Sequence, residues 1–362
     1  MINHSAIEGL RLLLQASLGE MPKGIPQGFD IQDVFELSQR QGVTALSFDG
    51  LKKLAEVYPE ILENTSSARA VKLKWIASMV AQEKLYRENL LAANELSDFL
   101  SENNIYTYVL KGTSISRLYP VPSHRFSCDL DCFLVSKDGI SDAYTMGNSL
   151  VASKGVRVDT SYYKHSVFQY KGLKVENHHF CCSIKRSKRT KELELYLEVS
   201  LKNFIPEYLQ GTTLALPPQM FQALFMIEHA NGHFLYSKMT IKHVCDWIVI
   251  KRSFKDTLNW EEFNRVCTRF GLKDFVCCMD KLADYLLGYC NYQDLQPLGR
   301  RVLDDTFKEL CLSSNKMRQR IEKALVVLHS SWKFKHFCAD SMIKELTHSA
   351  WAYLITDNPH LD

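Results

Sequence analysis

The chain has 362 residues, of which 46% are hydrophobic and 23% are charged, and its formal net charge is +3. These fractions are ordinary for a globular protein, and the length predicts two or three domains. The small net charge is not that of a dedicated nucleic-acid-binding protein. The eleven cysteines show no CxxC spacing, which argues against a zinc ribbon and indicates reduced thiols in a cytosol.

Residues 1–19 lack the basic start, long apolar run and small-residue cleavage site of a signal peptide, and they fit an amphipathic helix. No stretch approaches the roughly eighteen uninterrupted apolar residues that a membrane span needs. We therefore expect a soluble, cytoplasmic protein with no membrane partner.

In chain order, the sequence predicts three regions. Residues 1–103 carry apolar side chains at helical spacing and end in a long helix over Ser66–Asn103. Residues 104–215 combine short aromatic and β-branched runs with a few helices, which is the pattern of a small mixed sheet. Residues 216–362 are helical again. The predicted fold is therefore α+β, with a small mixed β-sheet core flanked by N-terminal and C-terminal helical regions.

The elements of the core and of the C-terminal region are expected within the following bounds. Strands are predicted at Ile105–Leu110, Cys128–Val135, Val156–Tyr162, Val167–Tyr170 and Leu173–Cys181. Helices are predicted at Thr113–Leu118, Ile140–Gly155, Glu192–Leu201, Phe221–Phe234, Ile241–Lys251, Trp260–Phe270, Phe275–Leu287, Asp304–Leu312 and Lys316–His329.

The stretch VLKGTSISRLYPVPSHRFSCDLDCFLV, residues 109–135, carries the strongest chemical pattern. Side chains alternate along a strand, so Asp129 and Asp131 share one face. Two adjacent carboxylates repel each other unless a cation lies between them, and magnesium prefers such oxygen ligands together with substrate phosphates. The glycine turn at Gly112 precedes this pair and can receive a phosphate. The alternative is a pair of solvated carboxylates, which the surrounding apolar residues disfavour.

Glu176 is the best candidate for a third carboxylate, because it lies mid-strand between apolar residues, where an unpartnered charge is unfavourable. If its strand lies beside that of Asp129, Glu176 completes the cluster. The alternative is an edge strand with Glu176 facing water, and a register slip by one residue would also turn it away. Glu194 and Glu198 are weaker candidates on a predicted helix.

Two further groups leave alternatives open. The basic run at residues 185–191 is expected as a solvated loop, or as a contact for polyphosphate or a nucleic-acid backbone. His229 and His233 lie one helical turn apart and can bind zinc, with His243 or Asp246 as a third ligand, or they can pack near the sheet and form hydrogen bonds. His178 and His179 face opposite ways on a strand, so at most one of them faces the carboxylates.

Several motifs in order resemble the polymerase-β-like nucleotidyltransferase superfamily, and more closely a bacterial family of uncharacterised nucleotidyltransferases. The motifs are Leu110-Lys111-Gly112-Thr113, Leu118-Tyr119-Pro120, Arg125, Asp129-Leu130-Asp131, Val175-Glu176-Asn177-His178, Glu228-His229-Ala230 with His233-Phe234, and Lys242-His243-Val244-Cys245-Asp246-Trp247.

The resemblance implies one or two Mg²⁺ ions held by Asp129, Asp131 and Glu176, with Glu176 helping to deprotonate an acceptor. It also implies that the turn around Gly112 and Thr113 holds the triphosphate of a nucleotide. Lys111 either adds a charge for the phosphates or points outward, and Arg125 either contacts a phosphate or is a loop arginine.

The leading functional hypothesis is a magnesium-dependent nucleotidyltransferase that moves a nucleoside monophosphate from a nucleoside triphosphate to an unidentified small-molecule, protein or RNA acceptor. The alternative is a non-catalytic nucleotide-binding or regulatory module with the same fold. A zinc hydrolase built on His229 and His233 ranks below both.

Overall fold

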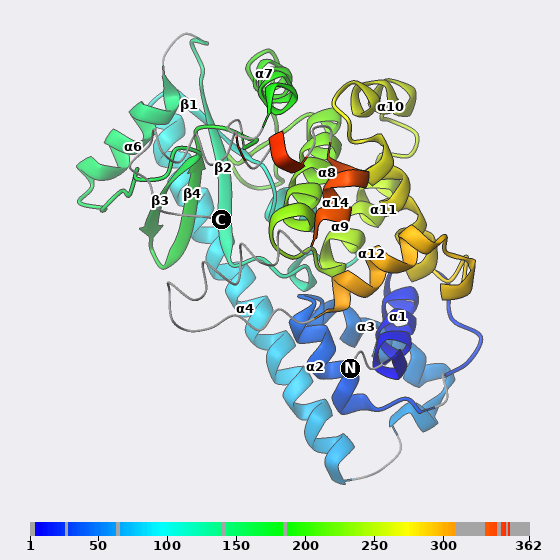
Figure 1. Ribbon diagram of the computed structural model, residues 1–362. Coiled ribbons are helices and arrows are strands. Elements are labelled where there is room, and N and C mark those ends of the chain that lie inside the picture. The colour runs from blue at the N-terminus through cyan, green and yellow to red at the C-terminus, as the bar shows by residue number, and fades with distance from the viewer. Residues whose placement is uncertain are drawn as a thin grey trace.

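The computed structural model describes residues 4–25, 28–62, 66–139, 142–183, 187–308, 330–338, 342–344 and 347. The sheet and α6 lie on one side of the molecule, and α8, α9 and α11 lie on the other (Figure 1). The long helix α4 runs from the N-terminal helices to the sheet (Figure 1). In this described part of the chain, no helix is both long and apolar enough to cross a lipid bilayer.

The N-terminal region is helical, as predicted. It contains α1 (His4–Leu18), α2 (Ile31–Arg40), α3 (Thr44–Val57), the 3₁₀ helix η1 (Pro59–Leu62) and α4 (Ser66–Glu102). Helix α2 begins where it does because the Asp30 carboxylate accepts hydrogen bonds from two free backbone N–H groups of its first turn, at 2.8 and 3.0 Å. The indole N–H of Trp75 in α4 donates to the carbonyl of Thr44 at 2.7 Å, which joins α4 to α3.

The core is a six-stranded mixed sheet in the order β3-β4-β2-β1-β6-β5. Its strands are β1 (Ile105–Val109), β2 (Asp129–Ser136), β3 (His165–Tyr170), β4 (Leu173–His178), β5 (Glu207–Tyr208) and β6 (Ala215–Leu216). The helical elements among them are α5 (Thr113–Ser116), η2 (Pro122–His124), α6 (Ala143–Ser153) and α7 (Lys188–Lys202). The predicted α+β fold with helical flanks is confirmed.

The alternation of side chains along β2 divides the sheet into two faces. Leu130, Cys132 and Leu134 belong to a buried cluster with residues of α4 and α6. Helix α6 approaches this face closely, because a Cβ atom on Gly147 would lie 2.2 Å from Leu134 Cδ1. Phe133 belongs to the other cluster, which includes residues of α8 and α9. Asp129 and Asp131 share the face of Phe133, so the fold presents them to the C-terminal helices.

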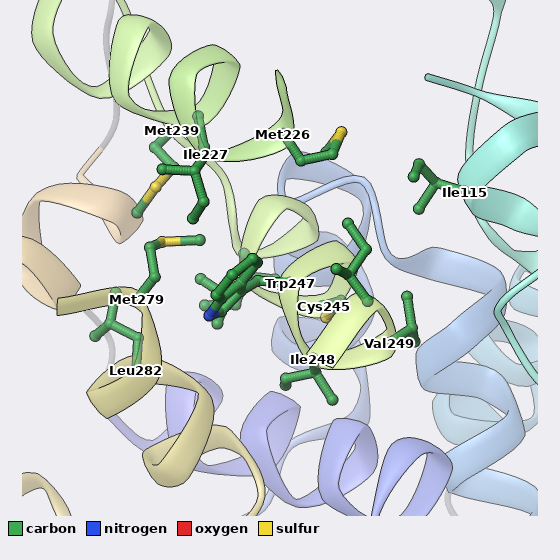
Figure 2. Packing of buried hydrophobic residues seen from close by; sticks show 14 of the residues in the cluster. Ile115, Met226, Ile227, Met239, Cys245, Trp247, Ile248, Val249, Met279 and Leu282 are labelled. Carbon is green, nitrogen blue, oxygen red and sulfur yellow. The ribbon is translucent and has the colours of Figure 1, made fainter. Parts of the chain in front are cut away.

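The C-terminal region contains α8 (Gln219–Tyr236), α9 (Ile241–Ser253), α10 (Trp260–Arg269), α11 (Lys273–Leu286), η3 (Tyr292–Asp294), α12 (Pro297–Phe307) and α14 (Ser331–Phe337). Figure 2 shows Trp247 of α9 beside Met279 and Leu282 of α11. The Trp247 indole N–H donates to Asp280 Oδ1 at 2.8 Å, so the buried ring keeps its polar atom satisfied. Residues of α1 and α3 belong to the same apolar cluster, so the two helical regions share one core.

Several predicted elements differ from the observed ones. The strand predicted at 156–162 is wrong, because only Asp159 forms an isolated bridge, with Val167. The Asp159 side chain accepts a hydrogen bond from the backbone N–H of Ser161 at 2.9 Å, and this local turn ends the extended run. The short strands β5 and β6 were not predicted. The helix predicted at 316–329 lies outside the described residues.

The predicted loop at 185–191 is partly wrong as well. Helix α7 already begins at Lys188, since the Ser187 hydroxyl caps it by accepting from the backbone N–H of Thr190 at 3.1 Å. Lys188 is exposed and lies 3.9 Å from Glu192, which fits a solvated helix face. Residues 185 and 186 of the run lie outside the described residues.

Candidate active site

The predicted carboxylates come together on one face of the sheet. Strands β2 and β4 pair in parallel, with Asp129 opposite Lys174 and Asp131 opposite Glu176. The condition set for Glu176, that its strand lies beside the Asp129 strand, is therefore met. Asp131, Glu176 and His178 form a group whose possible ligand atoms all lie within 4.8 Å of one another. Asp129 is not part of that group, although it lies on the same face two residues before Asp131.

Asp131 is the most buried member, with 1% of its surface exposed. Its Oδ1 atom accepts from Lys111 Nζ at 3.2 Å and lies 3.1 Å from His178 Nε2. Its Oδ2 atom is buried and has no hydrogen-bond partner among the described residues. Burial alone would raise the pKa of Asp131, but Lys111 and His178 hold it below its ordinary value. Asp131 is therefore a carboxylate at neutral pH, with one oxygen still unsatisfied.

The other two carboxylates have different environments. Burial, and then repulsion from Asp131, raise the pKa of Asp129. Burial and Asp131 also act to raise the pKa of Glu176, but its contacts with Lys174 and His165 bring it below the ordinary value. Lys174 Nζ lies 2.5 Å and His165 Nε2 lies 3.7 Å from the Glu176 carboxylate. Glu176 is therefore held as an ionised, hydrogen-bonded group.

The turn that precedes the carboxylate strand requires glycine. Gly112 has φ +73°, and a Cβ atom there would lie 3.1 Å from Ser127 Oγ. The chain then enters the short helix α5, where Thr113 Oγ1 and Ser114 Oγ are buried without hydrogen-bond partners in the described part of the protein. The backbone N–H of Leu110 donates to the carbonyl of Asp131 at 2.9 Å, which ties the turn to β2. Two buried hydroxyl groups without partners among the described residues thus follow the glycine of this turn.

Two lysines approach the carboxylates. Of the two orientations considered for Lys111, the structure shows the inward one, in which the ammonium contacts Asp131. Burial opposes its charge, but the carboxylates of Asp131, Asp129 and Glu176 raise the pKa of Lys111. Lys242 comes from α9, and its Nζ lies 3.5 Å from the Phe126 carbonyl. Burial, and then the charge of Arg125, lower the pKa of Lys242 to about 8.

Arg125 forms a buried ion pair with Asp246 of α9. Its guanidinium donates two hydrogen bonds to the Asp246 carboxylate, at 2.7 and 2.9 Å, and both side chains are almost completely buried. The Tyr119 hydroxyl donates to Asp246 at 2.7 Å. Burial would lower the pKa of Arg125, but Asp246 raises it, so the pair stays charged. Arg125 thus joins the core to α9 through Asp246.

The three histidines singled out by spacing also meet. His229, His233 and His243 place possible ligand atoms within 4.8 Å of one another. His243 is therefore the third member of this cluster, while Asp246 is engaged by Arg125 and Tyr119. The His229 Nε2 atom lies 3.4 Å from Lys111 Nζ, so the histidine cluster adjoins the carboxylate site through one lysine.

Sequence reasoning assigned no role to His165 and Lys242, and it left open whether His178 or His179 faces the carboxylates. His178 had a signal, because it lies two residues after Glu176 on the same strand and shares its face. His165 becomes visible only when β3 pairs with β4 and places it opposite His178. Lys242 has no local signal, since it reaches the site from α9.

Comparison with known proteins identifies the family of the chain. The site combines a glycine turn with carboxylates on neighbouring strands, which is the general plan of the nucleotidyltransferases that the sequence motifs resemble. The family described as "Uncharacterised nucleotidyltransferase" matches residues 27–288. Because this match covers more than half of the chain, the protein belongs to that nucleotidyltransferase family. The polymerase-β-like superfamily is consistent with the match. No curated protein and no solved structure matches the chain.

Proposed function

We propose that the protein is a magnesium-dependent enzyme that transfers a nucleoside monophosphate from a nucleoside triphosphate to a hydroxyl group of an acceptor. The observation that carries the proposal is the in-register pairing of Asp131 with Glu176, which places two carboxylates side by side next to the glycine turn. Family membership supports nucleotidyl transfer in general.

The donor set fits a magnesium ion. Lys111 and His178 both contact Oδ1 of Asp131, so the unsatisfied Oδ2 atom is the oxygen available to a cation. Asp129 adds a second carboxylate on the same face, and hard divalent cations prefer oxygen ligands of this kind. We propose Asp129, Asp131 and Glu176 as the residues that hold one or two ions. When bound, Mg²⁺ would neutralise charge on the phosphates.

The turn after β1 fits the phosphates. Thr113 Oγ1 and Ser114 Oγ are buried without partners in the described residues, and a phosphate oxygen can accept a hydrogen bond from a hydroxyl group. Lys111 supplies a positive charge at the same turn. Gly112 allows a close approach of the ligand to the backbone, because it has no side chain. We therefore propose Lys111, Gly112 and Thr113 as the triphosphate-binding residues. We also propose that Arg125 stabilises this site indirectly, through its ion pair with Asp246.

In the proposed reaction, the oxygen of the acceptor hydroxyl forms a bond with the α-phosphorus. The bond from that phosphorus to the oxygen bridging to the β-phosphate breaks, and pyrophosphate leaves in line with the attack. The acceptor hydroxyl loses its proton in this step. Glu176 is the proposed proton acceptor, because its lowered pKa keeps it ionised at neutral pH.

A thermal-shift panel of the four nucleoside triphosphates, each with and without Mg²⁺, tests the proposal. A ligand at 100 times its dissociation constant stabilises the folded state by about 2.7 kcal/mol. We expect a magnesium-dependent shift in the wild type that is lost in Asp131→Asn and kept in Asp256→Asn, a matched exposed aspartate. The bound nucleotide is then used with a labelled α-phosphate to screen acceptors.

The panel and the acceptor screen distinguish the proposed enzyme from a nucleotide site elsewhere and from a non-catalytic module. A shift lost in Asp131→Asn, followed by transfer of the label to an acceptor, supports the enzyme. A shift that persists in Asp131→Asn places the nucleotide elsewhere and contradicts the proposed site. Binding at the carboxylates without transfer to any small-molecule, protein or RNA acceptor would favour the non-catalytic nucleotide-binding module.

A further inference from the structure

Three imidazole rings converge beside the carboxylate site without being part of it. His229 and His233 are one turn apart on α8, and His243 lies in the first turn of α9. Their ring centroids are 4.5 Å apart for His229 and His233, 5.2 Å for His233 and His243, and 6.0 Å for His229 and His243. One possible ligand nitrogen from each ring lies within 4.8 Å of the others.

We infer that His229, His233 and His243 form a binding site for a transition-metal ion of the zinc class, separate from the carboxylates. Imidazole nitrogen is a preferred ligand of Zn²⁺ and related ions, whereas Mg²⁺ requires oxygen ligands. Three protein ligands leave a fourth position of a tetrahedral ion open to water or to a group of the substrate.

The rings are held in a form that can bind an ion. A histidine must be unprotonated to bind a metal. Burial, and then nearby positive charge, lower the pKa of His229 well below its ordinary value, and burial with the neighbouring His233 does the same for His243. The His243 ring is also fixed in place, because its Nδ1 atom lies 3.2 Å from the carbonyl oxygen of Thr240. An Nδ1–H group that donates to this oxygen leaves Nε2 free to bind an ion. Such second contacts orient a ligand ring.

The charges around the cluster select the class of ion. Lys111 lies 3.4 Å from His229 Nε2, which disfavours weakly held cations. This ammonium is also 3.2 Å from the Asp131 carboxylate, which offsets part of its charge. The cluster therefore favours an ion that forms strong bonds to nitrogen over a hard cation.

The test measures metal binding without nucleotide, so its result is independent of the proposed function. The full chain is stripped with a chelator and titrated with Zn²⁺ in competition with a chromogenic chelator. His233→Gln removes one ligand and is compared with His336→Gln, an exposed histidine outside the cluster. Glu176→Gln reports on the other candidate site, and the absorption of bound Co²⁺ reports nitrogen ligation. Melting curves of all variants check that each one folds.

We expect about one ion per wild-type chain, with affinity lowered about tenfold or more in His233→Gln and unchanged in His336→Gln and Glu176→Gln. Equal affinity in the wild type and His233→Gln would overturn the inference and would point to the free cysteines. A loss confined to Glu176→Gln would place the ion at the carboxylates and would also overturn it. If His233→Gln does not fold, the Co²⁺ spectrum of the wild type decides the question. A spectrum without nitrogen ligation would overturn the inference.

Discussion

At the scale of single residues, the two aspartates of one DxD motif have opposite electrostatic environments. Lys111 and His178 lower the pKa of Asp131, while burial and repulsion raise the pKa of Asp129. The difference arises because, among the described residues, Lys111 and His178 contact the Asp131 carboxylate and no such contact is present at Asp129. Asp131 is thus the permanent anion of the site, and Asp129 depends more on an added cation to stay ionised.

Lys242 gives the first prediction, on pH dependence. Its pKa of about 8 means that the ammonium is charged below this pH and loses its charge as the pH rises through it. If Lys242 attracts the phosphates, nucleotide affinity falls between about pH 7 and pH 9 in the wild type. Titration calorimetry with the nucleotide found in the thermal-shift panel measures this dependence.

Lys242→Arg is the matched control for that measurement. A guanidinium stays charged at all these pH values, so the fall in affinity above pH 8 should disappear in this variant. An affinity that is constant with pH in the wild type, or a fall that is the same in Lys242→Arg, would show that another group titrates.

At the scale of elements, the packing of α1 against α3 depends on a glycine in the middle of a helix. A Cβ atom on Gly50 would lie 1.8 Å from the carbonyl oxygen of Leu13. The intrinsic helix propensity favours alanine over glycine by about 1 kcal/mol. However, the clash involves backbone atoms of α1 and cannot be relieved by a side-chain rotation.

We therefore predict that Gly50→Ala destabilises the protein by about 2 kcal/mol or more, because the two helices must move apart. Urea denaturation measures the free energy of unfolding, and Glu56→Ala on the exposed side of α3 is the control, with an expected change within about 0.5 kcal/mol. A gain in stability for Gly50→Ala would contradict the close approach of α1 and α3.

The elements also show what could be predicted from the sequence. The strand at Asp129 was predictable because a strand that is buried on both faces appears in the sequence as a short continuous apolar run. The strand predicted at 156–162 failed because Asp159 forms a local turn that outweighs β propensity. The pairing of β2 with β4 brings Asp131 beside Glu176. The sequence allowed this pairing but could not establish it, because strand register depends on contacts between residues distant in sequence. Lys242 was unpredictable for the same reason.

At the scale of the whole molecule, charged groups on the connection between α5 and β2 link the three regions. His124 of η2 lies 2.5 Å from Asp49 of α3 and 2.9 Å from Glu83 of α4. Burial would lower the pKa of His124, but these two carboxylates raise it above its ordinary value of 6.5. The connection is thus attached to the N-terminal helices by a protonated histidine between two carboxylates.

This arrangement predicts a pH-dependent stability. A histidine whose pKa is raised on folding stabilises the folded state fully below its unfolded pKa of 6.5, and that contribution is lost as the pH rises through the raised value. The free energy of unfolding, measured by denaturation between about pH 6 and pH 9, should fall with pH more steeply in the wild type than in His124→Gln. Parallel pH profiles of the two proteins would rule out this role for His124.

The next residue, Arg125, joins the same connection to the C-terminal helices through Asp246. Asp246→Leu leaves a buried guanidinium without its counter-charge, which should cost about 3–5 kcal/mol of stability. Replacing both partners with apolar residues of similar size, Arg125→Met with Asp246→Leu, leaves no buried charge and should cost less than the single substitution. Denaturation of the wild type, both single variants and the double variant measures this coupling.

The same four proteins show whether the ion pair positions the active site. Arg125 is four residues before Asp129, so loss of the pair should let the start of β2 shift relative to the glycine turn. We expect the double variant to fold and yet to bind nucleotide more weakly, because ligand geometry at Asp129 is no longer fixed. Additive stability losses would contradict coupling between Arg125 and Asp246. Unchanged nucleotide affinity in the folded double variant would show that the pair only stabilises the fold.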